Sequence, residues 1–265
     1  MNEIFIDSTD QLIRHLNELP NHYIYRGHAN AAWRLQSSLE RVIGEAWSAE
    51  KAEQWESYSL DRFKSKFHLY DYENAEPKSK LAWLSLMQHY GVPTRLVDFT
   101  ESPYVALYFA LEAYMPHEGN DLAVYALDYK SVMDRSISYI TRRDSNFKET
   151  RSSVYRKQDQ IFEDIVDRFA YEIAWITEPA QLNARLDRQA GCFVLSGDKG
   201  SRIEQVLSSK DYEDCTVQKL IIHPALYEGV FALLRKMNIT SKSIYGDLGG
   251  LARSIRMELQ IYSVP

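Results

Sequence analysis

The chain has 265 residues, of which 45% are hydrophobic and 26% are charged. These are the proportions of a globular protein, and 11 Gly with 8 Pro are too few for a collagen-like or low-complexity chain. The net charge of −6 argues against a non-specific nucleic-acid binder, which would carry a strong positive field. A chain of this length can bury a large core without disulfides or metals.

The cysteines and the N-terminal segment indicate in which cellular compartment the protein is expected. Cys192 and Cys215 form no CxxC pair and have no zinc-ligand spacing, so we expect neither a disulfide framework nor a metal site. Residues 1–16 lack the basic and apolar regions of a signal peptide, and no run of about eighteen apolar residues occurs. We therefore predict a cytoplasmic protein that does not enter the membrane.

The first part of the chain predicts a helix, a strand and a long helical region. Ser8 is a typical N-cap for a short amphipathic helix that ends before Pro20. Residues 23–27 are aromatic and β-branched, which is typical of a strand. We expect helices through residues 37–69 and a polar loop at 71–80.

The next elements alternate between helix and strand. Apolar residues recur at helical spacing over 81–90 and stop at Gly91. Residues 94–100 alternate as a short strand. A Ser-Pro pair then provides an N-cap and a first-turn proline for a buried helix at 102–114. Residues 121–128 predict another strand.

The second half of the chain is predicted more coarsely. We expect strands at 174–176, 191–195 and 217–222, a helix or turn at 183–188, helices at 225–237 and 247–258, and a short strand or extended turn at 239–245. No internal repeat and no Gly/Ser linker divides the chain. We predict one α+β domain over 1–265, with helical or loop insertions at 45–80 and 131–170.

A basic stretch lies within the second insertion. Residues 142–157 contain six Arg and Lys side chains and two acidic ones. This composition favours a solvated loop or helix face. The alternative is a surface that attracts nucleic acid.

Four segments combine polar side chains with surroundings that would hold them in place: 25–41, 86–112, 185–195 and 244–252. The first begins Tyr25-Arg26-Gly27, and residues 88–110 read QHYGVPTRLVDFTESPYVALYFA. These segments resemble the FRG domain, a family named for an aromatic-Arg-Gly motif. The resemblance covers about residues 20–260. It implies a role in bacterial or phage conflict, as a defence effector or toxin that an antitoxin or regulator protein holds in check.

The chain also resembles the ADP-ribosyltransferase fold, whose core is a split β-sheet around an NAD cleft. In that fold one strand carries an Arg just before a Gly, a second leads through hydroxyl residues into a helix, and a third begins with a Glu or Gln. Arg26 and Gly27 match the first pattern, Thr100 and Ser102 the second, and Gln189 the third. Gln189 departs from the usual catalytic Glu.

This resemblance implies NAD as the cofactor and cleavage of its N-glycosidic bond through an oxocarbenium-like state. The diphosphate would lie against Arg26, because a guanidinium binds phosphate through two hydrogen bonds. The nicotinamide end would lie near Thr100, Ser102 and Tyr108, with Tyr108 or Tyr90 stacked on the ring. A ribose hydroxyl would face Gln189.

Further residues complete the predicted cleft. Gly27 lacks a Cβ where backbone would approach the ligand. Gln cannot act as a general base, so His28, His89, Asp98 or solvent would take the acceptor's proton. The full set expected to come together is Arg26, His28, Gln88, His89, Arg95, Asp98, Thr100, Ser102 and Gln189.

Several of these residues have structural alternatives. Arg95 and Asp98 either bind the ligand or form a buried ion pair that braces the site. His89 is either catalytic or a core histidine that bonds a backbone carbonyl. Arg26 is either a ligand-binding residue or a structural arginine at the end of a strand.

Other enzyme classes lack their motifs in this chain: there is no P-loop, Rossmann glycine motif, nucleophile elbow or metal-ligand cluster. We therefore predict an NAD-dependent ADP-ribosyltransferase-like effector that modifies a nucleic acid or a protein. The alternative is a non-catalytic nucleic-acid- or protein-binding module, which the basic stretch and the many aromatic residues would suit.

Overall fold

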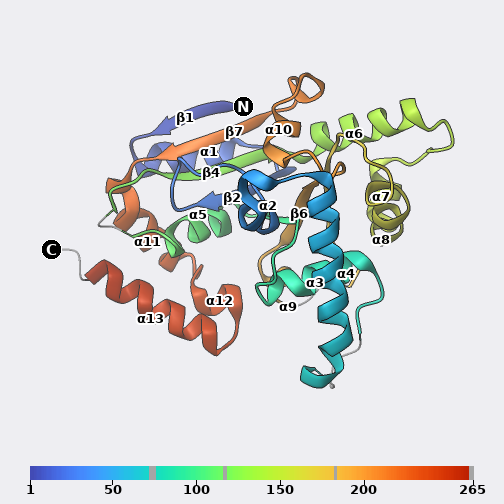
Figure 1. Ribbon diagram of the computed structural model, residues 1–265. Coiled ribbons are helices and arrows are strands. Elements are labelled where there is room, and N and C mark those ends of the chain that lie inside the picture. The colour runs from blue at the N-terminus through green and yellow to red at the C-terminus, as the bar shows by residue number, and fades with distance from the viewer. Residues whose placement is uncertain (72–75, 116–117, 182–183, 263–265) are drawn as a thin grey trace.

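The computed structural model describes residues 1–71, 76–115, 118–181 and 184–262. Within these residues, helices surround one seven-stranded mixed sheet (Figure 1). Across the sheet the strands are β1 (Asn2–Ile6), β7 (Val217–Ile222), β4 (Leu122–Asp128), β2 (Tyr23–His28), β3 (Val97–Thr100), β6 (Gly191–Ser196) and β5 (Ala174–Thr177). β1 and β7 are parallel, and the other neighbours are antiparallel. The protein is α+β, as predicted.

The sheet is weakly joined between β2 and β3. These two strands share a single register pair, Tyr25 with Thr100. β2 pairs with β4 along its whole length, from Tyr23 to His28. The sheet therefore consists of two parts, β1-β7-β4-β2 and β3-β6-β5, that meet at one point.

The helices of the described residues are α1 (Thr9–Glu18), α2 (Ser38–Ile43), α3 (Ala49–Tyr70), α4 (Lys80–His89), α5 (Pro103–Glu112), α6 (Tyr129–Arg143), α7 (Arg151–Arg156), α8 (Gln158–Ile161), α9 (Ala184–Arg188), α10 (Ile203–Leu207), α11 (Tyr227–Lys236), α12 (Ser241–Tyr245) and α13 (Leu248–Tyr262). Short 3-10 or π turns occupy Gly44–Ala46, Phe162–Val166, Lys210–Tyr212 and Pro224–Leu226. The predicted caps are confirmed: Ser8 Oγ accepts from Gln11 N, and Ser102 Oγ accepts from Val105 N.

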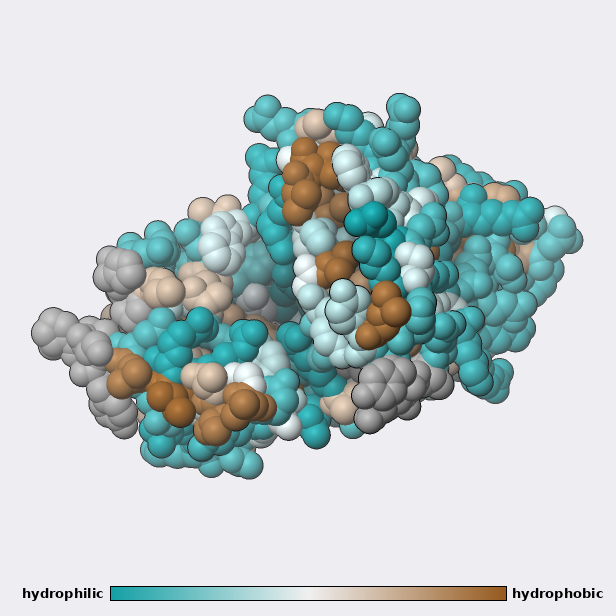
Figure 2. Space-filling model, turned by 60° about the horizontal axis from the view of Figure 1, so that its bottom comes forward, coloured by the Kyte–Doolittle hydropathy of each residue, from teal (hydrophilic) through white to brown (hydrophobic). Residues whose placement is uncertain are grey.

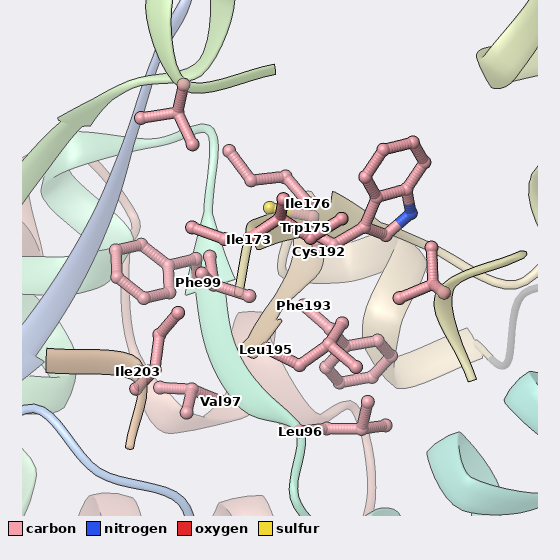
Figure 3. Close-up of a cluster of buried hydrophobic side chains, with 14 of the residues drawn as sticks. Leu96, Val97, Phe99, Ile173, Trp175, Ile176, Cys192, Phe193, Leu195 and Ile203 are labelled. Carbon is pink, nitrogen blue, oxygen red and sulfur yellow. The ribbon is translucent and has the colours of Figure 1, made fainter. Parts of the chain in front are cut away.

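The core forms on both faces of the sheet. One cluster includes Phe99, Trp175 and Phe193, and Figure 3 shows these side chains together with their neighbours on β3, β5 and β6. The other cluster includes Leu107 and Val124 and packs α5 against β4. Every residue of β6 is buried, which explains its continuous apolar run.

Two elements differ from the sequence prediction. Residues 239–245 were expected to be extended, yet Ser241–Tyr245 form helix α12, which begins with a capping box between Thr240 and Ser243. Strand β1 was not predicted, because it forms through parallel pairing with the distant strand β7. The predicted loop at 71–80 and the predicted segment at 183–188 extend over 72–75 and 183, which lie outside the described residues.

The two predicted insertions are largely helical. Residues 45–80 contain α3, and residues 131–170 contain most of α6 together with α7 and α8. Figure 1 shows them on the same side of the molecule, where α4 packs against α8. Among the described residues, none of the helices is both long and apolar enough to span a membrane.

Helix α13 presents apolar residues to solvent as well as to the protein. Ser254 and Met257 are buried, whereas Leu251, Ile255 and Leu259 are exposed along the outer side of the helix. Figure 2 shows this row of apolar residues at the lower left. The helix therefore packs through one narrow face and leaves another uncovered.

Candidate functional site

A cavity of about 260 Å³ lies where β2 and β3 meet. Strands β2, β3 and β6 and helices α4, α5, α9 and α12 all contribute to its wall. Of the residues predicted from the sequence, it is lined by Arg26, Gly27, Gln88, His89, Asp98, Thr100 and Gln189. His28, Arg95, Ser102 and Tyr108 do not line it. Three segments distant in sequence are thus brought to one cavity.

Arg26 is a partly buried cation on the cavity wall, with 17% of its side chain exposed. Its Nε donates to His28 Nε2 at 3.0 Å, and one terminal nitrogen donates to the Asp98 carbonyl oxygen at 2.7 Å. The same nitrogen lies 3.8 Å from Asp98 Oδ2, on a side chain that is 58% exposed. Burial lowers the pKa of Arg26, and the Asp98 charge partly opposes this effect. The guanidinium stays protonated. Its charge is only partly neutralised, which favours an anionic ligand.

His28 holds Arg26 in position. Its Nε2 is occupied by the Arg26 hydrogen bond, and its ring packs against Tyr125 at 5.0 Å between centroids. Burial and the Arg26 charge lower the pKa of His28 to about 3. The imidazole is therefore neutral at neutral pH and its accepting nitrogen is already used. The predicted role of His28 as a proton acceptor does not fit this arrangement.

Gln88 connects α4 to β3 and orients Asp98. Its Nε2 donates to Asp98 Oδ2 at 2.9 Å and to the Leu96 carbonyl at 3.2 Å. Its Oε1 accepts from Thr94 Oγ1 at 2.6 Å. Both ends of the Gln88 amide are thus satisfied by the protein itself.

Three buried polar atoms at the cavity have no hydrogen-bond partner within the described ranges. They are Ser85 Oγ, His89 Nδ1 and Gln189 Nε2. Burial lowers the pKa of His89, nearby Arg185 lowers it further, and Asp247 opposes both effects. Buried polar groups in folded proteins are nearly always paired with protein, water or ligand. The wall of the cavity therefore holds polar groups that the described residues leave unsatisfied.

Thr100 and Ser102 hold the backbone at the edge of the site. Thr100 Oγ1 donates to the Gln189 carbonyl oxygen at 2.6 Å and accepts from Ser102 N at 3.0 Å. Ser102 caps α5 and lies outside the cavity. The hydroxyl of Thr100 thus joins β3 to the chain after α9, which places Gln189 at the cavity.

Tyr108 does not line the cavity, so it does not take the ring-stacking position predicted from the sequence. It is 2% exposed, donates to Glu112 Oε1 at 2.9 Å and lies 2.7 Å from Ser241 Oγ. Phe109 lines the cavity in its place. Successive side chains of a helix point about 100° apart. Tyr108 therefore points into the core, whereas the next residue, Phe109, points to the cavity.

Gly27 is required by packing rather than by ligand approach. A Cβ at this position would lie 1.9 Å from the carbonyl oxygen of Ala106 and 2.6 Å from the nitrogen of Ala110. Both atoms belong to the backbone of α5. The missing side chain therefore allows α5 to lie directly on β2.

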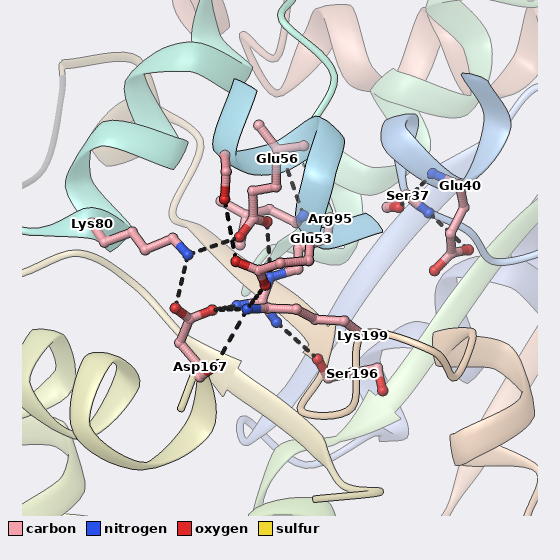
Figure 4. Close-up of polar contacts among 12 residues, drawn as sticks. Ser37, Glu40, Glu53, Glu56, Lys80, Arg95, Asp167, Ser196 and Lys199 are labelled. Carbon is pink, nitrogen blue, oxygen red and sulfur yellow. Dashed lines mark hydrogen bonds and ion pairs between the residues drawn. The ribbon is translucent and has the colours of Figure 1, made fainter. Parts of the chain in front are cut away.

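Arg95 belongs to a separate ion network, shown in Figure 4. Its Nε donates to Glu56 Oε2 at 2.9 Å, and its guanidinium also pairs with Asp167. Lys80 contacts the same two carboxylates, at 3.0 Å and 2.8 Å. Of the two alternatives for Arg95 and Asp98, the ion pair between them does not form, because Asp98 faces Arg26 instead, and Arg95 does not line the cavity.

The sequence interpretation missed several cavity residues. Glu112 and Tyr245 face each other there, with Tyr245 Oη donating to Glu112 Oε2 at 2.7 Å, and Arg185 lies 4.8 Å from the centre of the Tyr245 ring. Helical spacing was the available signal, since Arg185 and Gln189 are four residues apart. Glu112 likewise lies one turn after Phe109 on α5.

Comparison with known families agrees with the motifs of the first part of the chain. Residues 21–119 match the family described as the FRG domain. Residues 21–119 are an FRG domain. The matched region runs from β2 through α5, and it includes Arg26, His89, Asp98 and Thr100. No curated protein and no solved structure matches the chain.

The FRG domain match ends before the rest of the cavity wall. Arg185, Gln189 and Tyr245 lie after residue 119, as do the segments at 185–195 and 244–252. The site is therefore completed by residues outside the matched region.

The basic stretch also lies outside the FRG domain match. Arg151 pairs with Asp134 at 2.6 Å, Lys157 pairs with Glu149 at 2.8 Å, and Arg143 packs over the ring of Tyr139. These contacts favour the solvated helix face over a free cationic surface. In the part of the chain that the structure describes, no group of three or more His, Cys, Asp or Glu side chains is arranged to hold a metal ion.

Proposed function

We propose that this FRG-domain protein binds NAD in the cavity between β2 and β3 and transfers ADP-ribose to a nucleic acid or a protein. The observation that carries the proposal is that Arg26, Thr100 and Gln189 line one cavity at the weak point of the sheet. These are the positions that match the three strand motifs of the ADP-ribosyltransferase fold. A split sheet of the ADP-ribosyltransferase type is part of the proposal.

The cavity suits one half of NAD. Its volume of about 260 Å³ is near the lower end of ligand pockets, which measure roughly 300–1,000 Å³. It would enclose the nicotinamide and its ribose, with Phe109 against the ring and the free Gln189 Nε2 facing a ribose oxygen. Arg26 would bind the diphosphate, because its charge is only partly neutralised.

In the transfer step one bond to ribose C1′ breaks, another forms, and one proton leaves the acceptor. The bond between ribose C1′ and the nicotinamide nitrogen breaks, and nicotinamide leaves with the electron pair. A lone pair of the acceptor forms the new bond to C1′, and the acceptor loses a proton. His89 lines the cavity, and its Nδ1 has no partner in the described residues, so it is the group we assign to accept the proton.

The test uses purified protein with labelled NAD and protein, DNA and RNA acceptors. We expect nicotinamide release and label transfer by the wild type, and a loss of at least tenfold in both Arg26→Ala and Gln189→Ala. Arg14→Ala, which removes an exposed arginine of α1, is the matched control and is expected to retain full activity.

Absence of NAD binding, nicotinamide release and transfer in the wild type would contradict the proposal. Retention of an acceptor by such an inactive protein would favour the non-catalytic binding module. The role as a conflict toxin with an antitoxin or regulator partner rests on the FRG resemblance and stays a prediction.

A further inference from the structure

Glu112 is a buried carboxylate that the sequence motifs do not include. It is the last residue of α5, it lines the cavity, and its side chain is 10% exposed. Tyr108 donates to its Oε1 at 2.9 Å and Tyr245 to its Oε2 at 2.7 Å. Arg253 adds a weaker contact to Oε1 at 3.4 Å.

These donors hold the carboxylate in one place. A carboxylate offers roughly four acceptor sites, and the three contacts leave room for a ligand group. Tyr108 is itself fully enclosed by the core, and the guanidinium carbons of Arg185 and Arg253 lie 4.8 and 4.7 Å from the centre of the Tyr245 ring. The position of Glu112 is therefore set before any ligand enters.

The proposed reaction requires an anion near the ribose. Breaking the glycosidic bond places positive charge on C1′ and the ring oxygen, and the neutral Gln189 stands where the family pattern usually has a carboxylate. Asp98 is the other carboxylate on the wall, but it is 58% exposed and faces Arg26. Water and the guanidinium both weaken its field.

The electric field of the Glu112 carboxylate is screened less by water than that of Asp98. Its carboxylate lies in the protein interior, where charges interact more strongly than in water. Arg253, the cation paired with Glu112, is 45% exposed and makes only the long contact at 3.4 Å. A fixed charge in such a place stabilises a transition state without rearrangement of its surroundings.

We infer that Glu112 is the catalytic carboxylate of this cavity, contacting the ribose and stabilising the positive charge that develops there. This inference rests on the proposed function. The bonds that break and form are those of the transfer step above, and nicotinamide leaves with the electron pair. Glu112 itself neither gains nor loses a proton.

The test is Glu112→Gln, which keeps the shape of the side chain and removes its charge. We expect the NAD dissociation constant to change by less than about threefold, while nicotinamide release falls at least 100-fold, the size typical of losing one preorganised electrostatic contact. Glu101→Gln is the matched control, since Glu101 is an exposed carboxylate just before α5. Its rate is expected to equal that of the wild type.

A second variant guards against loss of folding. Tyr245→Phe keeps the charge and the ring but removes one donor to the carboxylate, and we expect nicotinamide release to fall at least fivefold with unchanged NAD affinity. Thermal unfolding shows whether each variant is folded. Unchanged release in either folded variant overturns the assignment of Glu112. A wild type that neither binds nor cleaves NAD refutes the proposed function itself.

Discussion

Two clusters of buried charge are built around β3, and they differ in how completely they are paired. In the ion network, Arg95 contacts Glu56 and Asp167, and Lys80 contacts the same two carboxylates. At the cavity, Arg26 donates to two neutral acceptors, its ion pair with the exposed carboxylate of Asp98 is long, and buried atoms such as Gln189 Nε2 have no partner among the described residues. Both clusters are formed by residues from several segments.

This difference separates a structural role from a binding role. A buried polar network in which each charge meets its opposite stabilises one arrangement of the chain. A polar cavity with unpaired atoms has a free-energy deficit that a ligand or water can remove. Residue type alone does not indicate which arginine is structural and which would bind a ligand. The carboxylates and polar atoms around Arg95 and Arg26, and how completely they are paired, do indicate it.

The largest expected effect comes from breaking the network. Arg95→Met removes the cation while keeping an apolar stem, so the buried carboxylate of Glu56 loses a partner. We expect the free energy of unfolding to fall by about 3–5 kcal/mol. Urea-induced unfolding measures this change. Arg14→Met, at an exposed position, is expected to stay within about 0.5 kcal/mol of the wild type. Equal effects in both variants would show that the ion network around Arg95 does not stabilise the fold.

A smaller effect is the loss of folding stability at acidic pH that His28, beside Arg26, causes. His28 has a pKa of about 3 in the folded protein, against an ordinary value of 6.5. The unfolded chain therefore binds a proton on this residue as the pH falls from 7 to 5, and the folded protein does not. This difference removes about 2 kcal/mol of stability over that range.

The variant His28→Gln isolates this contribution, because a glutamine oxygen can still accept from Arg26 Nε. We expect the loss of stability between pH 7 and pH 5 to be smaller than in the wild type by about 2 kcal/mol. Urea unfolding at the two pH values provides the comparison. The same loss in both proteins would show that His28 titrates normally in the folded state.

The smallest expected changes in folding stability are those that distinguish Gln88 from Gln189 on the cavity wall. Gln88→Leu removes the hydrogen bonds to Asp98, Leu96 and Thr94, and we expect it to cost about 1–3 kcal/mol. Among the described residues, the side-chain Nε2 of Gln189 makes no hydrogen bond, so Gln189→Leu is expected to change stability by less than about 0.5 kcal/mol. Urea unfolding of both variants tests the pair. A reversed order would mean that Gln189 is a structural residue.

Much of the secondary structure could be predicted because its signals are local. Caps such as Ser8 and Ser102 and the Ser-Pro start of α5 act within one helical turn, and the structure confirms them. Strand β1 was missed because its partner strand, β7, lies more than two hundred residues away. Helix α12 was missed because its capping box between Thr240 and Ser243 was not recognised.

The sequence by itself determined most of the helices and strands, the FRG motif and part of the cavity wall. Only the tertiary structure decided that Phe109 rather than Tyr108 faces the cavity, that Gly27 serves the packing of α5, and that Glu112 joins the wall. It also placed Arg95 beside Glu56 and Asp167, which are 39 and 72 residues away from it. Charge pairing and burial depend on neighbours that are distant along the chain, and no local pattern specifies them.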